Sequence, residues 1–357
     1  MDVEQNKKPL VTVVSPTRNR VSLLQMSLEC VWRQTIGPER IEIVVVDNYS
    51  TDDTARRFRE LAVQAPCRMR YHRMESNRGP AAARNAGAAL GEGEFIAFLD
   101  SDVQLKDDWL QTMLDLLQGD RRIGIGGGKL LFAPTPDRVN AYGGAMTRIG
   151  FAWDAHEGDK SDPVDQPMDC LWVPTAAAMM RRSLFESLGG FDEAFYACYE
   201  DVDLGWRANL AGYRSVCIPD AVTWHHIGAR VPTVGDTITY HYCKNRLRTM
   251  LKNYGVANLV KYVPIYTAYA LVDAVLRRPR IHRLKALLWN VIRLRDTLRS
   301  RSQVQRGRTV SDAELGRLFT PEYFPSSTVA RRRKWVADNV AAVGESSMAD
   351  SAVRQAR

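Results

Sequence analysis

Strand-like and helix-like patterns alternate along the first hundred positions of the chain. Four short runs suited to β-strands are separated by longer segments with apolar residues on a helical spacing. The predicted strands lie at 10–15, 41–48, 69–75 and 94–100, and the predicted helices at about 21–34, 50–64 and 79–93. This order predicts a parallel, open α/β sheet.

The pattern changes after a further predicted helix at 107–118. Short strand-like runs mix with long loops from about 123 to 226, and the chain is mainly helical and basic from about 240 onward. The glycine-rich run at 124–130 is predicted to be a strand edge with a structural role.

Polar groups follow several predicted strands at their carboxyl ends. Pro16–Asn19 follow the first strand, Asp47 ends the second, and Asp100 ends the fourth. Because ligands of open parallel sheets bind at this edge, we expect these groups to converge on one site.

The stretch FIAFLDSDV places the carboxylates of Asp100 and Asp102 directly after a buried strand. Most pairs of this spacing are solvated turns, but a position at the end of a parallel strand favours a bound cation. Carboxylate oxygens suit Mg²⁺ or Mn²⁺, which also bind phosphate oxygens. The sequence therefore predicts a divalent metal at this edge.

A second acidic cluster lies at 199–207. If this segment is helical, Asp203 and Arg207 lie four residues apart and can pair, with Glu200 on the same face. Asp201 lies to the side and is a candidate general base, which needs a carboxylate beside a nucleophilic hydroxyl. The alternative is an acidic helix N-terminus stabilised by the helix dipole.

Two further segments carry candidate ligand-binding groups. The adjacent His225 and His226 are candidates for a metal or phosphate contact. Gly79 opens a predicted helix, and its N-terminus together with Arg84 could bind a diphosphate. A capped helix with ordinary surface arginines is the alternative.

Composition and charge place limits on these interpretations. The 357 residues are 45% hydrophobic, as in globular proteins, and the six scattered cysteines predict reduced thiols in a cytosolic protein. The net charge of +8 is concentrated in 277–308, which holds eleven basic residues and one acid. An apolar stripe at 281–298 makes an anionic membrane surface the favoured partner over simple packing on the rest of the chain. No nucleic acid is expected, because no nucleic-acid reading motif is present.

Other classes of α/β protein fit the sequence less well. The first predicted strand is followed by SPTRNR, which lacks the glycines of a dinucleotide-binding turn. It also lacks the glycine- and lysine-rich phosphate loop expected of a nucleotidyltransferase. A glycosidase would need a paired acid and nucleophile on either side of the scissile bond.

Several motifs in order resemble the family 2 glycosyltransferases of GT-A fold, and in particular their bacterial rhamnosyltransferase-like branch. The resemblance covers about residues 10–255 and extends weakly to about 318. It rests on PTRNR (16–20), VVVDNYSTDDT (44–54), NRGPAAARNAG (77–87), FLDSDV (98–103), LGGFDEAF (188–195), EDVDLGWRANLAGYR (200–214) and the histidine that follows.

The resemblance implies an inverting, metal-dependent transfer of a sugar from a nucleotide-diphospho-sugar to an acceptor hydroxyl, with Mg²⁺ or Mn²⁺ as cofactor. A UDP- or dTDP-sugar is expected as donor, with dTDP-rhamnose among the candidates. The acceptor would be a polyprenyl-linked or cell-surface glycan intermediate. The alternatives are a soluble small-molecule acceptor, such as a natural product, or a non-catalytic protein that binds sugar nucleotides.

The resemblance also assigns roles to individual residues. Asp201 matches the catalytic base, and Asp102 and His225, with Asp100, match the metal site, with His226 as an alternative to His225. The donor-binding positions are Pro16, Thr17, Arg18, Asn19, Asp47, Asn48, Arg78, Gly79, Arg84, Asp100 and Ser101. The acceptor-side positions are Trp172, Thr175, Glu200 and Asp203. Relatives often carry Gly-Ala where this chain has Thr175-Ala176-Ala177. This departure lies on the acceptor side, so the resemblance says least about the identity of the acceptor.

The expected organisation has three parts. We expect a GT-A catalytic domain with a mostly parallel central sheet at 1–245, divided into a donor-binding half (10–105) and an acceptor-side half (106–245). A basic, partly amphipathic helical extension (246–318) and a loosely ordered tail (319–357) follow. The expected location is the cytoplasm, peripherally at the inner face of the cell membrane.

Overall fold

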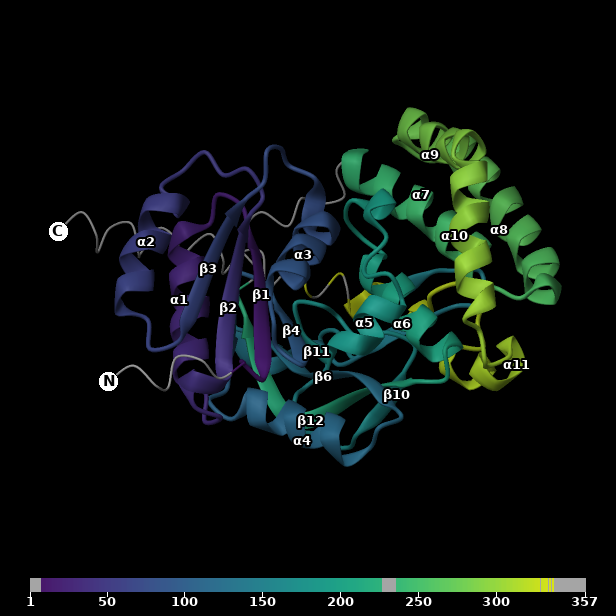
Figure 1. The fold of residues 1–357 in the computed structure, drawn as a ribbon. Helices are drawn as coiled ribbons and strands as arrows, with labels where there is room; N and C mark the ends of the chain where they lie inside the picture. Colours follow the sequence, from purple (N-terminus) through teal and green to yellow (C-terminus); the bar gives the residue numbers. More distant parts are fainter. Residues whose placement is uncertain (1–7, 227–235, 328, 333, 335, 337–357) are drawn as a thin grey trace.

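The computed structural model of the protein describes residues 8–226, 236–327, 329–332, 334 and 336. An α/β body occupies the left and centre of Figure 1, and a lobe of helices stands at its right. The helices of the body are α1 (Val21–Trp32), α2 (Thr54–Gln64), α3 (Gly79–Leu90), α4 (Trp109–Gly119), α5 (Arg182–Ser187) and α6 (Glu200–Leu210). Those of the lobe are α7 (Asp236–Asn253), α8 (Val256–Leu276), α9 (Arg280–Ile292), α10 (Leu294–Arg306) and α11 (Asp312–Leu315).

Most of the strands form one mixed sheet. Its main path runs in the order β10-β12-β6-β11-β4-β1-β2-β3, with β5 and β7 paired beside β12 and β6. The strands of this sheet are β1 (Val11–Thr17), β2 (Ile41–Asp47), β3 (Arg68–Arg73), β4 (Phe95–Leu99), β5 (Val103–Leu105), β6 (Ile123–Phe132), β7 (Thr135–Ala141), β10 (Met168–Cys170), β11 (Ala177–Arg181) and β12 (Arg214–His225). A separate hairpin consists of β8 (Gly144–Met146) and β9 (Ala152–Asp154).

The direction of the strands confirms the predicted, mostly parallel centre. Strands β1 to β4 pair in parallel. Strand β11 is antiparallel to both β4 and β6, so β6 and its parallel partner β12 point the same way as β1 to β4. The carboxyl ends of β1, β2, β4 and β12 therefore share one edge of the sheet.

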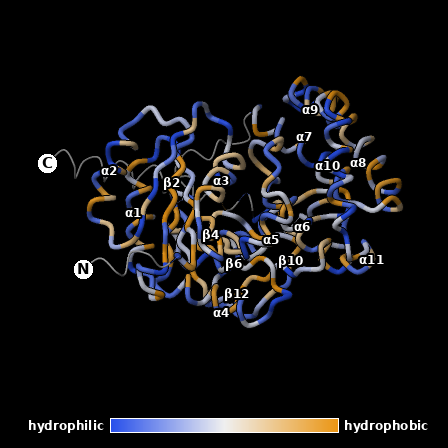
Figure 2. The backbone as a smooth tube through the Cα atoms, in the orientation of Figure 1, coloured by the Kyte–Doolittle hydropathy of each residue, from blue (hydrophilic) through white to orange (hydrophobic). Residues whose placement is uncertain are grey.

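Alternate residues of the central strands pack on opposite faces of the sheet. Val11 and Val13 of β1 contribute to the core beneath α1, α2 and α4, whereas Val14 packs toward α3, α5 and α6. The apolar strands thus lie inside two helical layers, as the hydropathy colouring shows (Figure 2). This rigid centre fixes the loops at the carboxyl edge.

The helical lobe is joined to the body by a third core. Trp206 of α6 stacks edge-on against Tyr254 at a centroid distance of 4.7 Å and against Phe319 at 5.2 Å. Helix α7 runs through the expected boundary at residues 245 and 246 without a break. The first residues of the expected tail are packed, since Thr320 donates its amide to the Met146 carbonyl at 2.9 Å; residues 337–357 of that tail lie outside the described residues.

Two local predictions are wrong. The second helix begins at Thr54 rather than near residue 50, because the Ser50 hydroxyl accepts the Asn19 amide of the loop after β1, and the Asp52 carboxylate accepts the amide of Thr54 itself. The glycine-rich run 124–130 is not a sheet edge, because it belongs to β6, which lies between β12 and β11. A Cβ at Gly128 would meet the Ala221 carbonyl oxygen of β12 at 1.8 Å, so this glycine permits the close approach of the two strands.

Candidate active site

The loop after β2 is built around Asp47, which is fully buried. Asp47 Oδ1 accepts the Ser50 amide at 2.7 Å, and Oδ2 accepts the Tyr71 hydroxyl at 2.5 Å and an Arg73 N–H at 3.3 Å. Burial and the Asp47 carboxylate raise the pKa of the Tyr71 hydroxyl. In this conformation Asp47 holds the loop after β2 in shape and has no exposed surface with which to contact the predicted base.

The neighbouring donor-side loops are tied to one another by asparagine side chains. The Asn19 side-chain oxygen accepts the Thr51 amide at 2.7 Å. Asn48 donates to Asn77 and accepts the Arg78 amide, both at 2.9 Å. The segment 16–19 and residues 48 and 78 are therefore brought together at the carboxyl edge, as the sequence predicts.

Arg84 connects the two halves of the body. Its guanidinium donates to Asp100 Oδ1 at 2.7 Å and to Glu200 Oε1 at 3.1 Å, and the residue is only 3% exposed. The alternative of an ordinary surface arginine is therefore excluded. Burial raises the pKa of Glu200, and the Arg84 charge opposes this shift. Arg84 thus positions the carboxylates of Asp100 and Glu200 at the carboxyl edge of the sheet, which is called the rim below. The Nε atom of Arg84 has no hydrogen-bond partner among the described residues.

Asp102 and His225 face each other across the ends of β4 and β12. Asp102 Oδ1 lies 3.5 Å from His225 Nε2, and Asp102 Oδ2 pairs with Arg20. Burial alone would raise the Asp102 pKa, but the bond and charge of His225 and the charge of Arg20 outweigh it and lower that pKa. The Arg20 guanidinium thus supplies positive charge where the sequence predicts a cation.

The two histidines are distinguished by strand alternation. His225 contacts Asp102, whereas His226 Nε2 lies 2.9 Å from Gln104 Oε1. His225 Nδ1 lies 2.8 Å from Asn140 Oδ1, a contact that orients the ring so that Nε2 faces Asp102. This arrangement favours His225 over His226 as a metal ligand.

The donor set at this point fits a partly hydrated divalent ion. Within the described part of the chain, no three His, Cys, Asp or Glu side chains gather closely enough to hold a metal by themselves. One carboxylate and one imidazole leave several coordination positions for water and diphosphate oxygens, which is how Mg²⁺ is usually bound. Asp100 lies nearby, with its side chain 30% exposed and held by Arg84.

Asp201 lies in the first turn of α6, next to Glu200, which is bonded to Arg84. Its Oδ1 accepts the Val202 amide at 2.8 Å. Burial, followed by the negative charges of Glu200 and Asp154, raises the pKa of Asp201 well above its ordinary value. A carboxylate with a raised pKa is a stronger base, which suits the predicted role.

The loop that presents Asp201 has an unusual backbone. Tyr196, Cys198 and Tyr199 all have positive φ angles, between 64° and 69°. The side-chain amide of Asn245 in α7 donates to the carbonyls of Phe195, Ala197 and Cys198 at 2.7 to 3.0 Å. Because L-residues rarely adopt this conformation, the contacts from α7 help to hold it.

The same loop touches the start of α3. Gly79 has φ +82°, and a Cβ there would lie 2.3 Å from the Tyr196 carbonyl oxygen. Glycine is therefore required at this position for two reasons, and the N-terminus of α3 lies against the loop that leads to Asp201.

Two predicted acceptor-side residues belong to the core instead. The predicted Asp203–Arg207 pair forms, at 2.7 Å, but Asp203 has no exposed surface and also accepts from Lys252 and Asn253. Trp172 is 4% exposed and packs beneath Gly144 and Gly205. Both residues are corrected from acceptor contacts to structural roles, because neither offers surface to a ligand.

The remaining predicted acceptor-side residues stay close to the rim. The Ala176 carbonyl accepts the Asp100 amide at 2.9 Å, which places Thr175 beside the Asp100 loop. Glu200 precedes Asp201 and is bound to Arg84.

Sequence reasoning missed four residues that shape the site. They are Arg20, Asn140, Asp154 and Asn245. Arg20 is part of the PTRNR motif and could have been assigned as a counterion of a nearby acid. The other three stand in segments without a motif, and only the fold brings them near Asp102 or Asp201.

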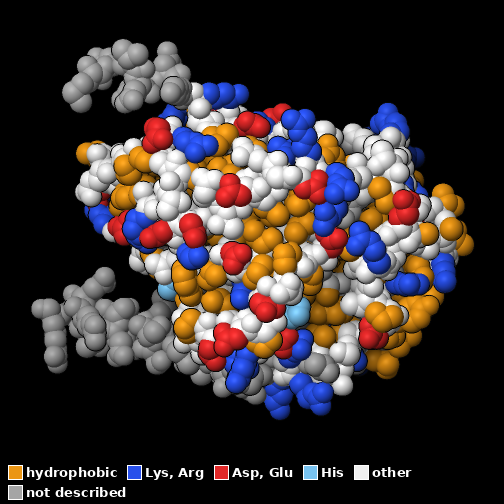
Figure 3. Space-filling model, turned by 90° about the horizontal axis from the view of Figure 1, so that it is seen from below, with side chains coloured by type: hydrophobic (Ala, Val, Ile, Leu, Met, Phe, Trp, Pro, Cys, Tyr) orange, Lys and Arg blue, Asp and Glu red, His pale blue; other side chains and the backbone are white. Residues whose placement is uncertain are grey.

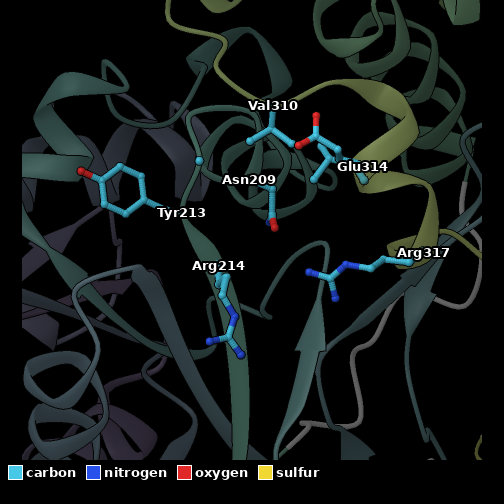
Figure 4. Close-up of a pocket in the computed structure, with 8 residues that line it drawn as sticks. Asn209, Tyr213, Arg214, Val310, Glu314 and Arg317 are labelled. Atoms are coloured by element: carbon cyan, nitrogen blue, oxygen red, sulfur yellow. The ribbon is translucent and has the colours of Figure 1, made fainter.

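A separate cavity of about 360 Å³ lies between the C-terminal turn of α6, the start of β12 and α11. Arg214 and Arg317 project toward it from opposite sides (Figure 4). Both arginines pair with Asp169, and Arg214 also pairs with Asp120. None of the predicted site residues lines this cavity.

Comparison with known sequences gives a consistent family. A sequence profile described as glycosyl transferase family 2 matches residues 12–189. The O-antigen biosynthesis protein RfbC of Myxococcus xanthus is 32% identical over 230 residues, which cover 62% of this chain and 18% of that protein. The pre-mycofactocin glycosyltransferase of Mycobacterium tuberculosis is 31% identical over 221 residues, covering 60% of this chain and 42% of that protein. This chain therefore spans less than half the length of these two relatives.

A further relative is matched over more of its own length, and two solved structures are matched over more of this chain. The N-acetylglucosaminyl-diphospho-decaprenol L-rhamnosyltransferase of M. tuberculosis is 29% identical over 217 residues, covering 54% of this chain and 69% of that protein. The mannosyltransferase PcManGT of Pyrobaculum calidifontis, solved with GDP-Man and Mn²⁺, has a TM-score of 0.52 at 20% identity and covers 85% of this chain and 87% of its own. GalNAc-T7, solved with UDP, GalNAc and Mn²⁺, has a TM-score of 0.58 at 15% identity and covers 79% of this chain and 55% of its own.

These two structures establish the fold, which is GT-A. The profile and the named relatives agree with the motifs at the carboxyl edge of the sheet. The chain belongs to the family 2 glycosyltransferases.

Proposed function

We propose that the protein is an inverting glycosyltransferase that moves a sugar from a nucleotide-diphospho-sugar to an acceptor hydroxyl. One observation carries the proposal. The buried Arg84 links the rim residue Asp100, on the donor side, to Glu200 at the start of the helix that carries Asp201. A candidate base and a candidate cation site are thereby held in one rigid network.

The chemistry requires one base on the acceptor side. The acceptor oxygen attacks the anomeric carbon while the bond from that carbon to the diphosphate breaks. The acceptor proton passes to the Asp201 carboxylate, and the nucleoside diphosphate leaves. Asp201 is suited to this step, because burial and neighbouring acids strengthen it as a base.

We propose that Asp102 and His225 hold Mg²⁺ or Mn²⁺, with Asp100 nearby. Such an ion supplies electrostatic stabilisation of the charge that develops on the leaving diphosphate. Asn140 Oδ1, 2.8 Å from His225 Nδ1, would hold the imidazole with Nε2 turned toward this position. The N-terminus of α3, with Gly79 and Arg78, is proposed to bind the diphosphate oxygens.

The identity of the substrates is proposed from the relatives. PcManGT was solved with GDP-Man and GalNAc-T7 with UDP, and one relative is named an L-rhamnosyltransferase. We propose a UDP- or dTDP-sugar donor, with dTDP-rhamnose as the first candidate, and a polyprenyl-linked glycan acceptor at the cytoplasmic face of the membrane. A soluble acceptor is the second candidate, because two other relatives are named for mycofactocin and validoxylamine A.

The experiment is a donor panel with Mn²⁺ on the wild type and on Asp201→Asn. Transfer should fall at least ~100-fold in the variant, as expected for the loss of a general base, while calorimetry shows unchanged donor binding. Asp115→Asn on α4, an exposed carboxylate that accepts from Gln111 within its own helix, is the matched control and should keep full activity. Full transfer activity of Asp201→Asn would show that Asp201 is not the general base.

A further inference from the structure

The outer face of α8 is almost entirely apolar and exposed. Helix α8 has 21 residues and is long and apolar enough to cross a membrane, yet only 28% of its most apolar window is buried. Its exposed positions carry a single charge, Lys261. The large ones are Val256, Val260, Ile265, Leu271, Val272, Val275 and Leu276, which are between 42% and 71% exposed.

This stripe continues onto the next two helices. Ile281, Leu284, Leu288, Val291 and Ile292 of α9 and Leu294 and Leu298 of α10 are also exposed. Apolar side chains gather at the right-hand end of the molecule in Figure 3, the end at which α8 lies in Figure 1. Exposed apolar surface of this extent is unusual in a monomer and marks a binding face.

The opposite face of α8 is tied to the protein along its length. Arg148 donates to the Tyr262 hydroxyl at 3.3 Å, and the Tyr266 hydroxyl donates to the Cys243 carbonyl at 3.3 Å. Near its end, the buried Asp273 pairs with Arg283 of α9. A helix that spans a bilayer would have to break all three contacts, so α8 is suited to lie along a surface rather than to cross it.

The charges around the stripe define what it can bind. Six exposed basic residues on α9, α10 and the loop before α9 form no ion pair with any acid in the described part of the chain. They are Arg278, Arg280, Lys285, Arg293, Arg295 and Arg299. A second copy of this face would bring like charges together, whereas long basic side chains beside apolar ones fit anionic headgroups above an acyl layer.

Aromatic residues stand beside this face. Tyr323 and Phe324 are 43% and 48% exposed and pack against Tyr262 and Tyr269 of α8, at centroid distances of 6.3 Å and 5.2 Å. Tyrosine and other aromatic rings with a polar edge concentrate at the boundary between headgroups and water.

We propose that α8 and α9 form an in-plane docking face for an anionic lipid bilayer, with α8 supplying the inserted apolar surface and 277–299 the headgroup contacts. The proposed membrane contact is therefore centred on α8, whereas the sequence placed it in the basic segment 277–308. Helix α7 lies between this face and the loop before Asp201. Its Lys244 donates to the Ala194 carbonyl at 2.8 Å and stands 4.6 Å from the ring of Trp289 in α9.

The test is flotation of the full chain with vesicles, without donor or acceptor, so that the result does not depend on the proposed transferase activity. The wild type should partition onto phosphatidylcholine vesicles that contain phosphatidylglycerol at least ~10-fold more strongly than onto phosphatidylcholine alone. The double variant Val272→Glu with Val275→Glu should lose at least ~10-fold in binding, because it places charges on the inserted face. Arg278→Gln with Arg280→Gln should weaken binding to the anionic vesicles only.

The matched control is Val63→Glu on α2, an apolar residue that is 87% exposed and belongs to the other end of the molecule. It should bind vesicles as the wild type does, and the melting curves of all variants should confirm that they are folded. Unchanged flotation of the double glutamate variant would overturn the proposal. Self-association in ultracentrifugation that this variant abolishes, without any vesicle binding by the wild type, would assign the face to a second copy instead.

Discussion

At the scale of single residues, the account depends on the protonation of Asp201. Burial and the charges of Glu200 and Asp154 raise its pKa, so the folded protein binds this proton more tightly than the unfolded chain does. The stabilising contribution of the protonated form is complete below the unfolded pKa, about 4 for an aspartate, and is lost as the pH rises through the folded pKa. The base, however, must be ionised to act.

Two measurements should therefore change together with pH. Transfer should rise as the pH passes upward through the folded pKa of Asp201. Over the same window, the melting temperature of metal-free Asp201→Asn should rise relative to that of the wild type, because the amide has no charge to desolvate. A variant that melts progressively lower than the wild type as the pH rises would contradict this assignment.

At the scale of elements, the important feature is the loop held by α7. Three non-glycine residues with positive φ precede α6, and the Asn245 amide donates to three carbonyls of that loop. This contact couples the helical lobe to the position of Asp201. The lobe is thus part of the site's support as well as the proposed membrane face.

Replacing Asn245 by alanine should open this loop selectively. The loss of three hydrogen bonds inside the protein should cost roughly 2–3 kcal/mol of unfolding free energy and raise hydrogen exchange at 195–199. Activity should fall through kcat, since the base is displaced. Asn209→Ala, which also removes a buried amide bonded to carbonyls, at 171 and 205, is the control and should leave exchange at 195–199 unchanged. Equal exchange in both variants would exclude the supporting role.

The elements themselves were largely predictable from the sequence. Periodicity identified the first four strands and the helices between them, because their apolar faces are continuous and local. The start of α2 was missed because Ser50, which resembles a helix cap, instead accepts the amide of Asn19 in the loop after β1, and Asp52 accepts the amide of Thr54. The interior position of β6 was missed because one of its glycines, Gly128, serves a contact with Ala221 of β12, which is far away in the sequence.

At the scale of the whole molecule, Arg84 joins parts that are far apart in sequence. Its partner Glu200 lies 116 positions away, and no local pattern indicates that the two meet. The motifs predicted residues that the fold brings together at the carboxyl edge of the sheet, but not that Asp203 and Trp172 would be buried. Asn140, Asp154 and Asn245 could not be predicted as neighbours of the site, because only the folding of distant segments brings them near His225, Asp201 and the loop before Asp201.

Arg84→Met should test this link between the halves. It leaves Asp100 and Glu200 without their buried cation, which should cost about 3–5 kcal/mol in urea unfolding and also abolish transfer. Arg78→Met is the control, because Arg78 pairs with Glu193 at the surface and should lose about 1 kcal/mol or less. A loss of stability no greater in Arg84→Met than in Arg78→Met would show that the network does not join the halves.

The most direct test of the account is the anomeric configuration of the product relative to that of the donor, measured by NMR after turnover with Mn²⁺. A single displacement with Asp201 as the base predicts inversion, so that an α-linked donor gives a β-linked product and a β-linked donor gives an α-linked one. A product that keeps the donor's configuration would require a nucleophile on the enzyme and would contradict the account.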